Sequence, residues 1–361
     1  MEQMKSKWIK IGKVLLSGLL AFVLLTLFSM LYANTPAHHH DPDGATDYRW
    51  DPDTFYSQAK EGFSAGHTNN EGYYCLRDYH AGDPVDILVM GSSHMEASNV
   101  QPEQSTAALL DSMLEDKAVY NIGTSAHLFL VCADNLKQAV KKYSPREYVI
   151  LETDRLRFSD EELRAVLEGT MKDIPSLEGG WVSLLQENQY LRLLYRQLQN
   201  RMGGNIRLPA SQNRLRGVEE APAEADTEEE ADDTQQVDAE ETGQDEAQNE
   251  QLLSELLGNL SDACKAKGAR LIIFFHPSTT VHEDGLLHME YFDEDAERFR
   301  NLCEENGITF LSMTGRFAEE YDAHYTVAYG FPNTLVGTGH LNKHGHKMIA
   351  EELYKLITED F

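Results

Sequence analysis

From residue 85 onward, the chain alternates between short apolar runs and longer segments with helical spacing. Five runs are rich in β-branched and aromatic residues and too short to be helices: 85–90, 118–122, 148–151, 270–275 and 308–311. Segments with helical spacing lie among them: 106–114, 128–143, 252–267 and 296–306. Strands that are apolar on both faces and alternate with helices indicate a parallel sheet covered on both sides. The sequence therefore predicts a three-layer α/β/α sandwich with about five parallel strands, in the flavodoxin-like order 2-1-3-4-5.

The N-terminal part contains an uncharged apolar run at residues 14–32. At 1.5 Å per residue, this run spans about 30 Å, close to the thickness of a bilayer core. Four lysines precede it and no basic residue follows until Arg49, so the basic tail, residues 1–13, is expected in the cytoplasm. The alternative is a cleaved signal peptide, whose apolar region is normally shorter, about 7 to 15 residues. Both interpretations place the main domain, residues 85–361, outside the cytoplasm.

Two insertions interrupt the main domain. Residues 158–204 are expected to be helical, because Ser159 and Glu162 form a capping box. A second helix over residues 181–202 is expected to pack on the core as an amphipathic helix, with a lid or a membrane-facing surface as the alternative. Residues 217–250 contain 15 acidic residues and no Lys or Arg. This stretch cannot bury enough apolar surface to offset the entropy of ordering, so it is expected to be a disordered loop.

Between the apolar run and the main domain, residues 33–84 form a predicted juxtamembrane segment rich in Asp, Pro, Gly and aromatic residues. Its tract His38, His39 and His40 can bind metal, but three adjacent side chains of an extended chain cannot all face one ion. A solvated linker is therefore expected here. The chain has four cysteines, at positions 75, 132, 264 and 303, with neither a CxxC motif nor a metal-binding spacing. Disulfides and free buried thiols both remain compatible with this pattern.

A serine and a histidine are placed where parallel strands would bring them together. Gly91-Ser92-Ser93 follows the first predicted strand and precedes a helix. Glycine permits a sharp turn at the end of a strand, and a serine there has an exposed hydroxyl close to a helix start. His340 precedes the last predicted helix, residues 343–357. Functional groups gather at the carboxyl ends of parallel strands, so Ser93 and His340 are expected to meet as nucleophile and general base.

The order of these motifs resembles that of the SGNH/GDSL hydrolase superfamily. Gly91-Ser92-Ser93 matches the Gly-Asp-Ser motif of that family, with Ser92 in the place of Asp. Gly123, after the second strand, matches its oxyanion-hole glycine, and His340 matches its C-terminal base. The resemblance covers residues 85–155 and 268–357. The Gly-Ser-Ser variant behind one N-terminal anchor is similar to exported acyltransferases of the teichoic-acid D-alanylation and alginate O-acetylation types.

The histidine motif departs from the pattern of that family. Thr338 stands where the family has an Asp two residues before the histidine. An acidic residue there would fix the imidazole tautomer and stabilise its cation, whereas a threonine offers a hydroxyl without a charge. Some members of that family use a Ser-His dyad, in which a backbone carbonyl holds the histidine. The resemblance implies a dyad of this kind for a chain with a threonine at position 338.

The third motif also differs, because residues 151–154 read Leu-Glu-Thr-Asp and contain no Asn. Thr153 is a candidate for a weaker oxyanion donor, beside the backbone N–H groups of Ser93 and Gly123. Asp154 is a candidate for orienting a catalytic group. Loss of one oxyanion donor typically slows an enzyme by about 100- to 1000-fold, so a slow or specialised enzyme is expected.

Two other histidines are candidates for contacting the substrate. His94 is beside the nucleophile, and His276 ends the fourth strand and points toward the same rim of the sheet. No HExxH or comparable spacing supports a metal site. Neither a metal nor a cofactor is therefore predicted, and a metal-dependent phosphodiesterase that uses the histidines at this rim is the weaker alternative.

These patterns predict an extracytoplasmic serine esterase or O-acyltransferase that acts on an envelope polysaccharide or glycolipid. Esterase and transferase share every step up to the acyl-enzyme, and a transferase would also require a membrane partner that delivers the acyl group. The formal net charge of −29 argues against nucleic acid, whose phosphates would be repelled. The alternative is a non-catalytic envelope scaffold or glycan-binding protein that retains the fold, which the threonine at position 338 and the altered third motif favour.

Overall fold

A five-stranded parallel sheet forms the centre of the molecule in the computed structural model, which describes residues 2–171, 190–191, 194, 239–281, 287–288 and 293–359. Its strands are β6 (Ile87–Met90), β7 (Val119–Asn121), β8 (Tyr148–Thr153), β9 (Arg270–Phe275) and β12 (Thr309–Ser312). Their spatial order is β12-β9-β8-β6-β7, and all neighbouring pairs are parallel. Read from the β7 edge, this is 2-1-3-4-5 in chain order, so the predicted fold class and strand order are confirmed.

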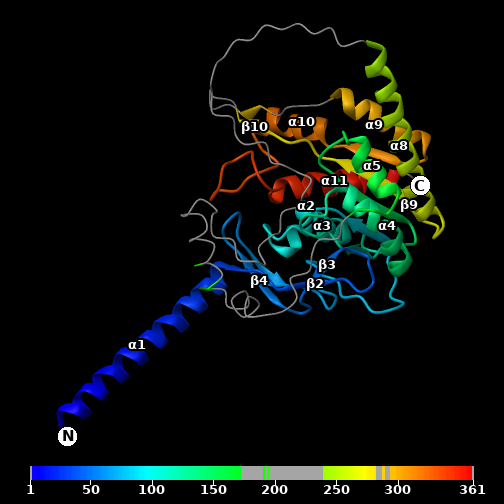
Figure 1. Cartoon of the computed structure of the whole chain (residues 1–361). Coiled ribbons are helices and arrows are strands. Elements are labelled where there is room, and N and C mark those ends of the chain that lie inside the picture. The colour runs from blue at the N-terminus through cyan, green and yellow to red at the C-terminus, as the bar shows by residue number, and fades with distance from the viewer. Residues whose placement is uncertain are drawn as a thin grey trace.

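Helices cover both faces of this sheet (Figure 1). One face carries α4 (Phe129–Tyr143), α5 (Asp160–Leu167), α8 (Ala239–Lys265) and α9 (Asp293–Glu305). The other carries α3 (Thr106–Met113), α10 (Thr314–His324) and α11 (Lys343–Glu359). Alternate side chains of each strand enter opposite cores: Leu271 and Ile273 of β9 enter one, and Ile272 and Phe274 the other. Burial of these apolar surfaces is the main stabilising contribution to the three layers.

The predicted insertions are described only in part. Ser159 and Glu162 form the expected capping box at the start of α5. The prediction of a disordered loop is wrong over residues 239–250, because α8 begins at Ala239. Their Ala, Glu and Gln residues are good helix formers, and the helix is fixed by the buried leucines that follow, such as Leu253. Residues 217–238 and nearly all of the predicted helix at 181–202 lie outside the described residues.

Helix α1 (Glu2–Tyr32) projects away from the folded body (Figure 1). Within it, residues Ser6–Tyr32 are long and apolar enough to cross a membrane, and an 18-residue window of this stretch has a mean hydropathy of 2.5. This stretch includes the apolar run predicted at residues 14–32. Its side chains are almost entirely uncovered by the rest of the chain.

The segment 33–84 is folded onto the sheet domain. An antiparallel sheet contains β1 (Ala33–Asn34), β4 (Phe55–Gln58) and β5 (Ser64–His67), and a second one pairs β2 (His38–His40) with β3 (Tyr48–Trp50). The linker prediction for the histidine tract is therefore wrong. The ring of His38 packs against Tyr48 and Trp50, and Tyr73 enters the main core. The folded body thus begins well before residue 85.

The remaining described elements are short, and the cysteines are unpaired. These elements are α2 (Ser93–Glu96), the 3-10 turn η1 (Pro102–Gln104), and the pair β10 (Thr280–Val281) and β11 (Leu287–His288). All four cysteines are free thiols, and Cys132, Cys264 and Cys303 are buried. Of the two alternatives that the sequence leaves open, the structure thus has the free thiols.

Candidate active site

Ser93 lies at the carboxyl end of β6, between β8 and the edge strand β7, and opens the short helix α2. Ser92 is the N-cap of this helix, and its side chain accepts a hydrogen bond from the N–H of His94 at 3.3 Å. A side chain at Gly91 would overlap with the carboxylate of Glu152, so the turn requires a glycine at this position. The local sequence thus turns the chain sharply and presents Ser93 at the rim of the sheet.

The structure brings His340 to this serine. Its Nε2 lies 2.9 Å from Oγ of Ser93, across a separation of 247 residues in the chain. The loop that carries His340 is fixed at the start of α11, where Oδ1 of Asn342 accepts hydrogen bonds from the N–H groups of His344 and Gly345. The predicted pair therefore has the geometry of a nucleophile and its base, although its catalytic role stays a prediction.

A residue that the sequence does not single out completes the arrangement. Glu61, in the loop between β4 and β5, places Oε2 at 2.7 Å from Nδ1 of His340. Its Oε1 accepts the backbone N–H of His340, also at 2.7 Å. The carboxylate that the sequence lacks at Thr338 is thus supplied from the N-terminal segment. Thr338 itself donates its hydroxyl to the carbonyl of Leu335, so it does not orient the imidazole.

The loop that carries Glu61 is fastened to the loop before His340. Asn333 donates to the carbonyls of Ala59 and Gly62 at 3.0 and 3.2 Å, and accepts the N–H of Gly62 at 3.0 Å. Gly62 has φ +74°, and a side chain there would overlap with the carbonyl of Asn99. Asn99 in turn donates to the carbonyl of Glu61. These contacts hold the carboxylate in register with the imidazole.

The two ionisable groups of this pair change each other's proton affinity. Burial alone would lower the pKa of His340, but the hydrogen bond and charge of Glu61 outweigh it and raise that pKa above its ordinary value. Burial alone would raise the pKa of Glu61, but its hydrogen bonds to His340 and the charge of the imidazole hold it below its ordinary value. Glu61 thus remains ionised at neutral pH, and it stabilises the imidazolium that forms when His340 takes up a proton.

Two of the three predicted oxyanion donors are engaged elsewhere. The N–H of Gly123 donates to Oδ1 of Asn121 at 3.0 Å. Thr153 is buried, and its hydroxyl donates to the carbonyl of Arg155. The N–H of Ser93 lies in the first turn of α2, where backbone donors have no partner within the helix. Of the three predicted donors, the structure therefore offers the N–H of Ser93 for an oxyanion.

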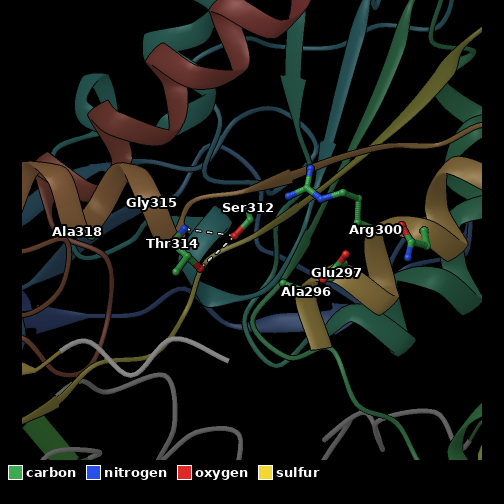
Figure 2. A pocket seen from close by; sticks show the side chains of 8 residues that line it. Ala296, Glu297, Arg300, Ser312, Thr314, Gly315 and Ala318 are labelled. Atoms are coloured by element: carbon green, nitrogen blue, oxygen red, sulfur yellow. Dashed lines mark hydrogen bonds between the residues drawn. The ribbon is translucent and has the colours of Figure 1, made fainter. Parts of the chain in front are cut away.

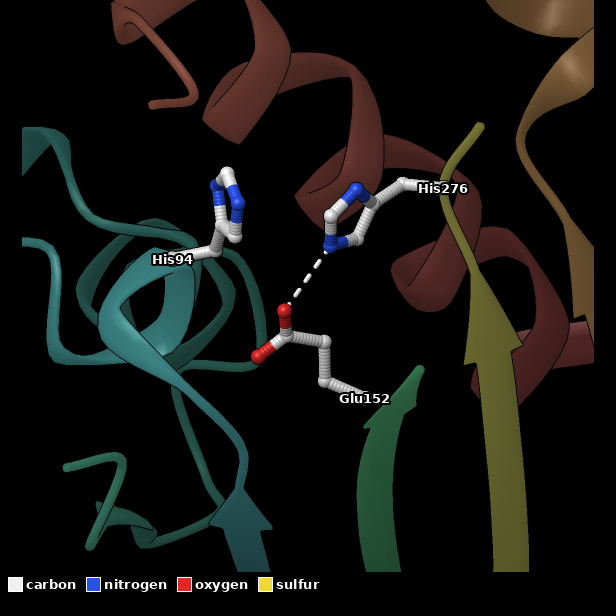
Figure 3. A group of neighbouring side chains, drawn as sticks. All are labelled: His94, Glu152 and His276. Atoms are coloured by element: carbon white, nitrogen blue, oxygen red, sulfur yellow. Dashed lines mark hydrogen bonds and ion pairs between the residues drawn. The ribbon is translucent and has the colours of Figure 1, made fainter. Parts of the chain in front are cut away.

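His94, Glu152 and His276 form a cluster beside the nucleophile loop (Figure 3), and their polar atoms lie close enough together for a metal ion to be considered. Nε2 of His276 is, however, 2.8 Å from Oε1 of Glu152. Two ligands of a tetrahedral zinc ion, each at about 2.1 Å, are about 3.4 Å apart. Both carboxylate oxygens also accept hydrogen bonds from Ser92. These contacts fit a hydrogen-bond network better than a metal centre.

The other candidates line a small cavity of about 150 Å³ next to His340. Its lining is largely polar: His94, Asp154, His276, Ser278, Thr279, Tyr329, Thr338 and Gly339. Burial, together with the charges of His276 and His340, keeps the pKa of His94 well below its ordinary value, so its imidazole is neutral. Burial and the neighbouring charge of Glu152 raise the pKa of Asp154. The Ser93 hydroxyl is hydrogen-bonded to His340 and to neither of these residues, and both line the cavity.

A larger hollow of about 630 Å³ lies at the β12 edge of the sheet, between α9 and α10 (Figure 2). Its lining includes Glu297, Arg300, Ser312 and Thr314. The two hydroxyls among these residues bond each other at 3.0 Å, and none of the lining residues belongs to the Ser93 site. Since no nucleophile and base converge there, the small cavity beside His340 is the better candidate for chemistry.

No protein-family model and no curated protein sequence matches this chain. Solved structures align with it at low similarity. TesA and a "putative arylesterase" from Agrobacterium tumefaciens are each 12% identical, with a TM-score of 0.37, over 76% of this chain and 98% of theirs. The protein YxiM from Bacillus subtilis is 11% identical, with a TM-score of 0.39, over 82% of this chain and 60% of its own. Similarity at this level carries no functional information, so the function is inferred from the geometry of the site.

Proposed function

We propose that this chain is a serine esterase or O-acyltransferase of the SGNH/GDSL type, with Ser93, His340 and Glu61 as its catalytic triad. The observation that carries this proposal is the continuous hydrogen-bonded chain from a carboxylate to a hydroxyl. Its two links measure 2.7 Å from Glu61 to His340 and 2.9 Å from His340 to Ser93. A hydroxyl is a weak nucleophile and is activated by a base of this kind. The order of the motifs along the sheet supports the same family.

In the proposed reaction, Nε2 of His340 accepts the proton of Ser93 as Oγ forms a bond to an ester carbonyl carbon. The carbonyl electron pair moves to its oxygen, and the resulting oxyanion accepts the N–H of Ser93. The oxyanion then collapses, the bond to the leaving alkoxide breaks, and His340 returns the proton to that alkoxide. Water or a sugar hydroxyl then attacks the acyl-enzyme, and His340 again takes up and returns one proton. Glu61 holds the imidazole in the required tautomer throughout.

The size and lining of the cavity support the proposal of a short acyl group. Its volume of about 150 Å³ and polar lining suit an acetyl group and nearby hydroxyls better than a long acyl chain. We further propose that α1 anchors the protein in the cell membrane, with its lysine-rich end in the cytoplasm. The site would then face the envelope, and an envelope polysaccharide or glycolipid would be the substrate. A transferase of this kind would also contact a membrane partner that supplies the acyl group.

One observation favours the second candidate function, a non-catalytic scaffold or glycan-binding protein. Gly123 and Thr153 have other hydrogen-bond partners, which leaves a single oxyanion donor among the three predicted ones. Loss of such donors weakens catalysis by about 100- to 1000-fold each. The two candidates differ in one measurable property, the reactivity of Ser93.

The experiment is fluorophosphonate labelling of the full-length protein in detergent. We expect a covalent adduct on Ser93, identified by peptide mass, and none in Ser93→Ala. Ser112→Ala is the matched control, because its hydroxyl lies on α3 and donates to the carbonyl of Leu109; its labelling should equal that of the wild type. A wild-type protein that melts cooperatively but is neither labelled nor active on a chromogenic acetyl ester would be a scaffold. If Ser93 is labelled, adding glycan acceptors to the acetyl ester assay separates esterase from transferase.

A further inference from the structure

We propose that Glu152 is a positioning residue that clamps the nucleophile loop, and that His276 holds Glu152 in place as a buried imidazolium. This inference rests on the proposed function, because positioning matters only if Ser93 is the nucleophile. It assigns a role to two buried side chains that take no part in the proton transfer described above (Figure 3).

The clamp consists of two hydrogen bonds from one residue to one carboxylate. The backbone N–H of Ser92 donates to Oε2 of Glu152 at 2.6 Å, and its hydroxyl donates to Oε1 at 2.8 Å. Hydrogen bonds to an ionised acceptor are the strong ones, and this carboxylate is only 2% exposed. Ser92 directly precedes Ser93 and also caps α2. A rotation of Ser92 that displaced Ser93 would therefore break its two hydrogen bonds to Glu152.

The hydrogen-bond partners of His276 support the charge proposed for it. The hydroxyl of Tyr329 donates to the carbonyl of Pro277, so at 2.8 Å from Nδ1 of His276 it acts as the acceptor. Nε2 lies 2.8 Å from Oε1 of Glu152, an oxygen that already accepts a hydrogen bond. Beside an ionised Glu152, each ring nitrogen therefore faces an acceptor and carries a proton of its own. A doubly protonated His276 satisfies both contacts and balances the buried charge of Glu152.

Burial makes this balance necessary. The side chains of Glu152 and His276 are each 2% exposed, and an isolated carboxylate at such a site would have a large desolvation cost. Removing one partner of a buried pair leaves the other uncompensated, so the pair is expected to act as a unit. The ring of His94, 4.6 Å from that of His276, remains neutral and adds no second cation. The positive charge thus faces Glu152 alone within the cluster.

The test compares labelling rates and steady-state kinetics of the full-length protein. Glu152→Gln keeps the shape of the side chain, but its amide turns an N–H toward Ser92 or His276, where donors already point. We expect kcat on a chromogenic acetyl ester and the rate of fluorophosphonate labelling to fall together by about 10- to 100-fold, as for a nucleophile displaced by about 1 Å. KM should change less than about twofold, because Glu152 does not line the cavity. If the role of Glu152 were purely structural, Glu152→Gln would lower the melting temperature without lowering kcat at a nearly constant KM.

Two milder variants keep the test decisive if Glu152→Gln does not fold. Ser92→Ala removes the hydroxyl hydrogen bond to Glu152, which is one of the two bonds of the clamp. It should lower kcat about three- to tenfold. Tyr329→Phe removes the acceptor of Nδ1 and should lower it by a similar factor, since it loosens His276 while leaving Glu152 in place. Glu168→Gln removes an exposed carboxylate after α5 and should match the wild type.

The outcomes separate the two proposals. If wild-type Ser93 is not labelled, the proposed function fails and the positioning role falls with it. If the wild type is labelled, and the clamp variants that fold are labelled at its rate, the positioning role alone is overturned. Ring-nitrogen chemical shifts from ¹⁵N-histidine should show both nitrogens of His276 protonated at pH 7.5. A neutral His276 would overturn the proposal that this residue is a buried imidazolium. One equivalent of tightly bound zinc in the purified protein would also overturn it.

Discussion

The parallel sheet and the N-terminal segment, residues 33–84, both reach the candidate site, but they are held together by different forces. The sheet places Ser93 at the end of β6, a strand whose side chains are buried on both faces. The segment places Glu61 in a loop between two four-residue strands. The sheet is thus specified by a repeated apolar pattern, whereas the segment combines aromatic packing with individual polar contacts. A group proposed as catalytic can therefore come from a region whose local sequence resembles a linker.

Buried polar groups lie in the interior of that segment, beside an aromatic cluster of Trp50, Tyr56 and Tyr74. Asp41 is fully buried, accepts the N–H groups of Ala45 and Thr46, and lies 3.1 Å from the guanidinium of Arg49. Each such group depends on its partner, because an unpaired buried charge is costly. The segment is therefore expected to be more sensitive to single polar substitutions than the sheet. The activity of variants in this segment distinguishes a catalytic role from that of a spacer.

The largest effect is expected for Glu61→Gln. Loss of the carboxylate removes the group that fixes the tautomer of His340 and stabilises its cation, so kcat/KM should fall by about 10³- to 10⁴-fold, the range for triad carboxylates. The measurement is steady-state hydrolysis of an acetyl ester by the full-length protein.

The matched control is Asp53→Asn, an exposed carboxylate of the same segment at φ +50°, a conformation that asparagine tolerates. It should retain wild-type activity. If Glu61→Gln and Asp53→Asn are equally active, Glu61 has no catalytic role. The segment would then be a spacer that contributes no group to the site.

The sequence predicts the sheet well because its signal is periodic. The five strands and α3, α4 and α11 all lie within a few residues of the predicted ranges. The meeting of Ser93 and His340 follows from the rule that the carboxyl ends of parallel strands share one rim. A strand buried on both faces has an apolar run that is visible without knowledge of its partners.

Glu61 could not be found in the same way. It is one of many acidic residues in the segment, and its partner lies 279 positions further along the chain. The threonine at position 338 indicates that an acid is missing, but no local pattern indicates which acid replaces it. The strands that flank Glu61 have only four residues each, too few for a clear alternation. The engagement of Gly123 and Thr153 with other partners likewise depends on side-chain hydrogen bonds that the sequence does not show.

A moderate effect is expected at the contact between the two regions. Asn333→Ala removes three hydrogen bonds that fasten the loop of Glu61 to the loop of His340. Glu61 would remain but be less well placed, so kcat should fall about tenfold while Ser93 stays reactive. Asn333→Asp keeps the acceptor for the N–H of Gly62 and loses the two donated bonds, so it should give an intermediate rate. Wild-type kinetics in Asn333→Ala would show that Glu61 is positioned without the hydrogen bonds from Asn333.

A smaller effect is expected from moving the acid to the position used by the resembling family. In the double variant Glu61→Gln with Thr338→Asp, we expect less than about a tenfold recovery of kcat/KM over Glu61→Gln alone. The side chain at position 338 bonds the carbonyl of Leu335 and is not directed at Nδ1 of His340. Full recovery would show that the sheet domain can provide its own acid.

The pH dependence of activity should shift with the same substitution. His340 acts as a base only when neutral, so kcat/KM should fall as the pH drops through its pKa. Because Glu61 raises the pKa of His340, the residual activity of Glu61→Gln should lose its base at a lower pH than the wild type does. An inflection at the same pH in both proteins would mean that Glu61 does not set the proton affinity of His340.

The smallest effect is expected on folding stability. The raised pKa of His340 contributes stability that is present below its ordinary value of 6.5 and is lost as the pH rises through the raised value. The lowered pKa of Glu61 contributes stability that is present above its ordinary value of 4.5 and is lost as the pH falls through the lowered value. Both contributions coexist between pH 4.5 and 6.5. There, Glu61→Gln should reduce the free energy of unfolding by no more than about 1 kcal/mol, because the pair is partly exposed. Melting curves of the wild type and of Glu61→Gln, recorded from pH 4 to 9, should therefore differ most in this window. A difference in melting temperature that does not depend on pH would mean that no ion pair joins the sheet to the segment 33–84.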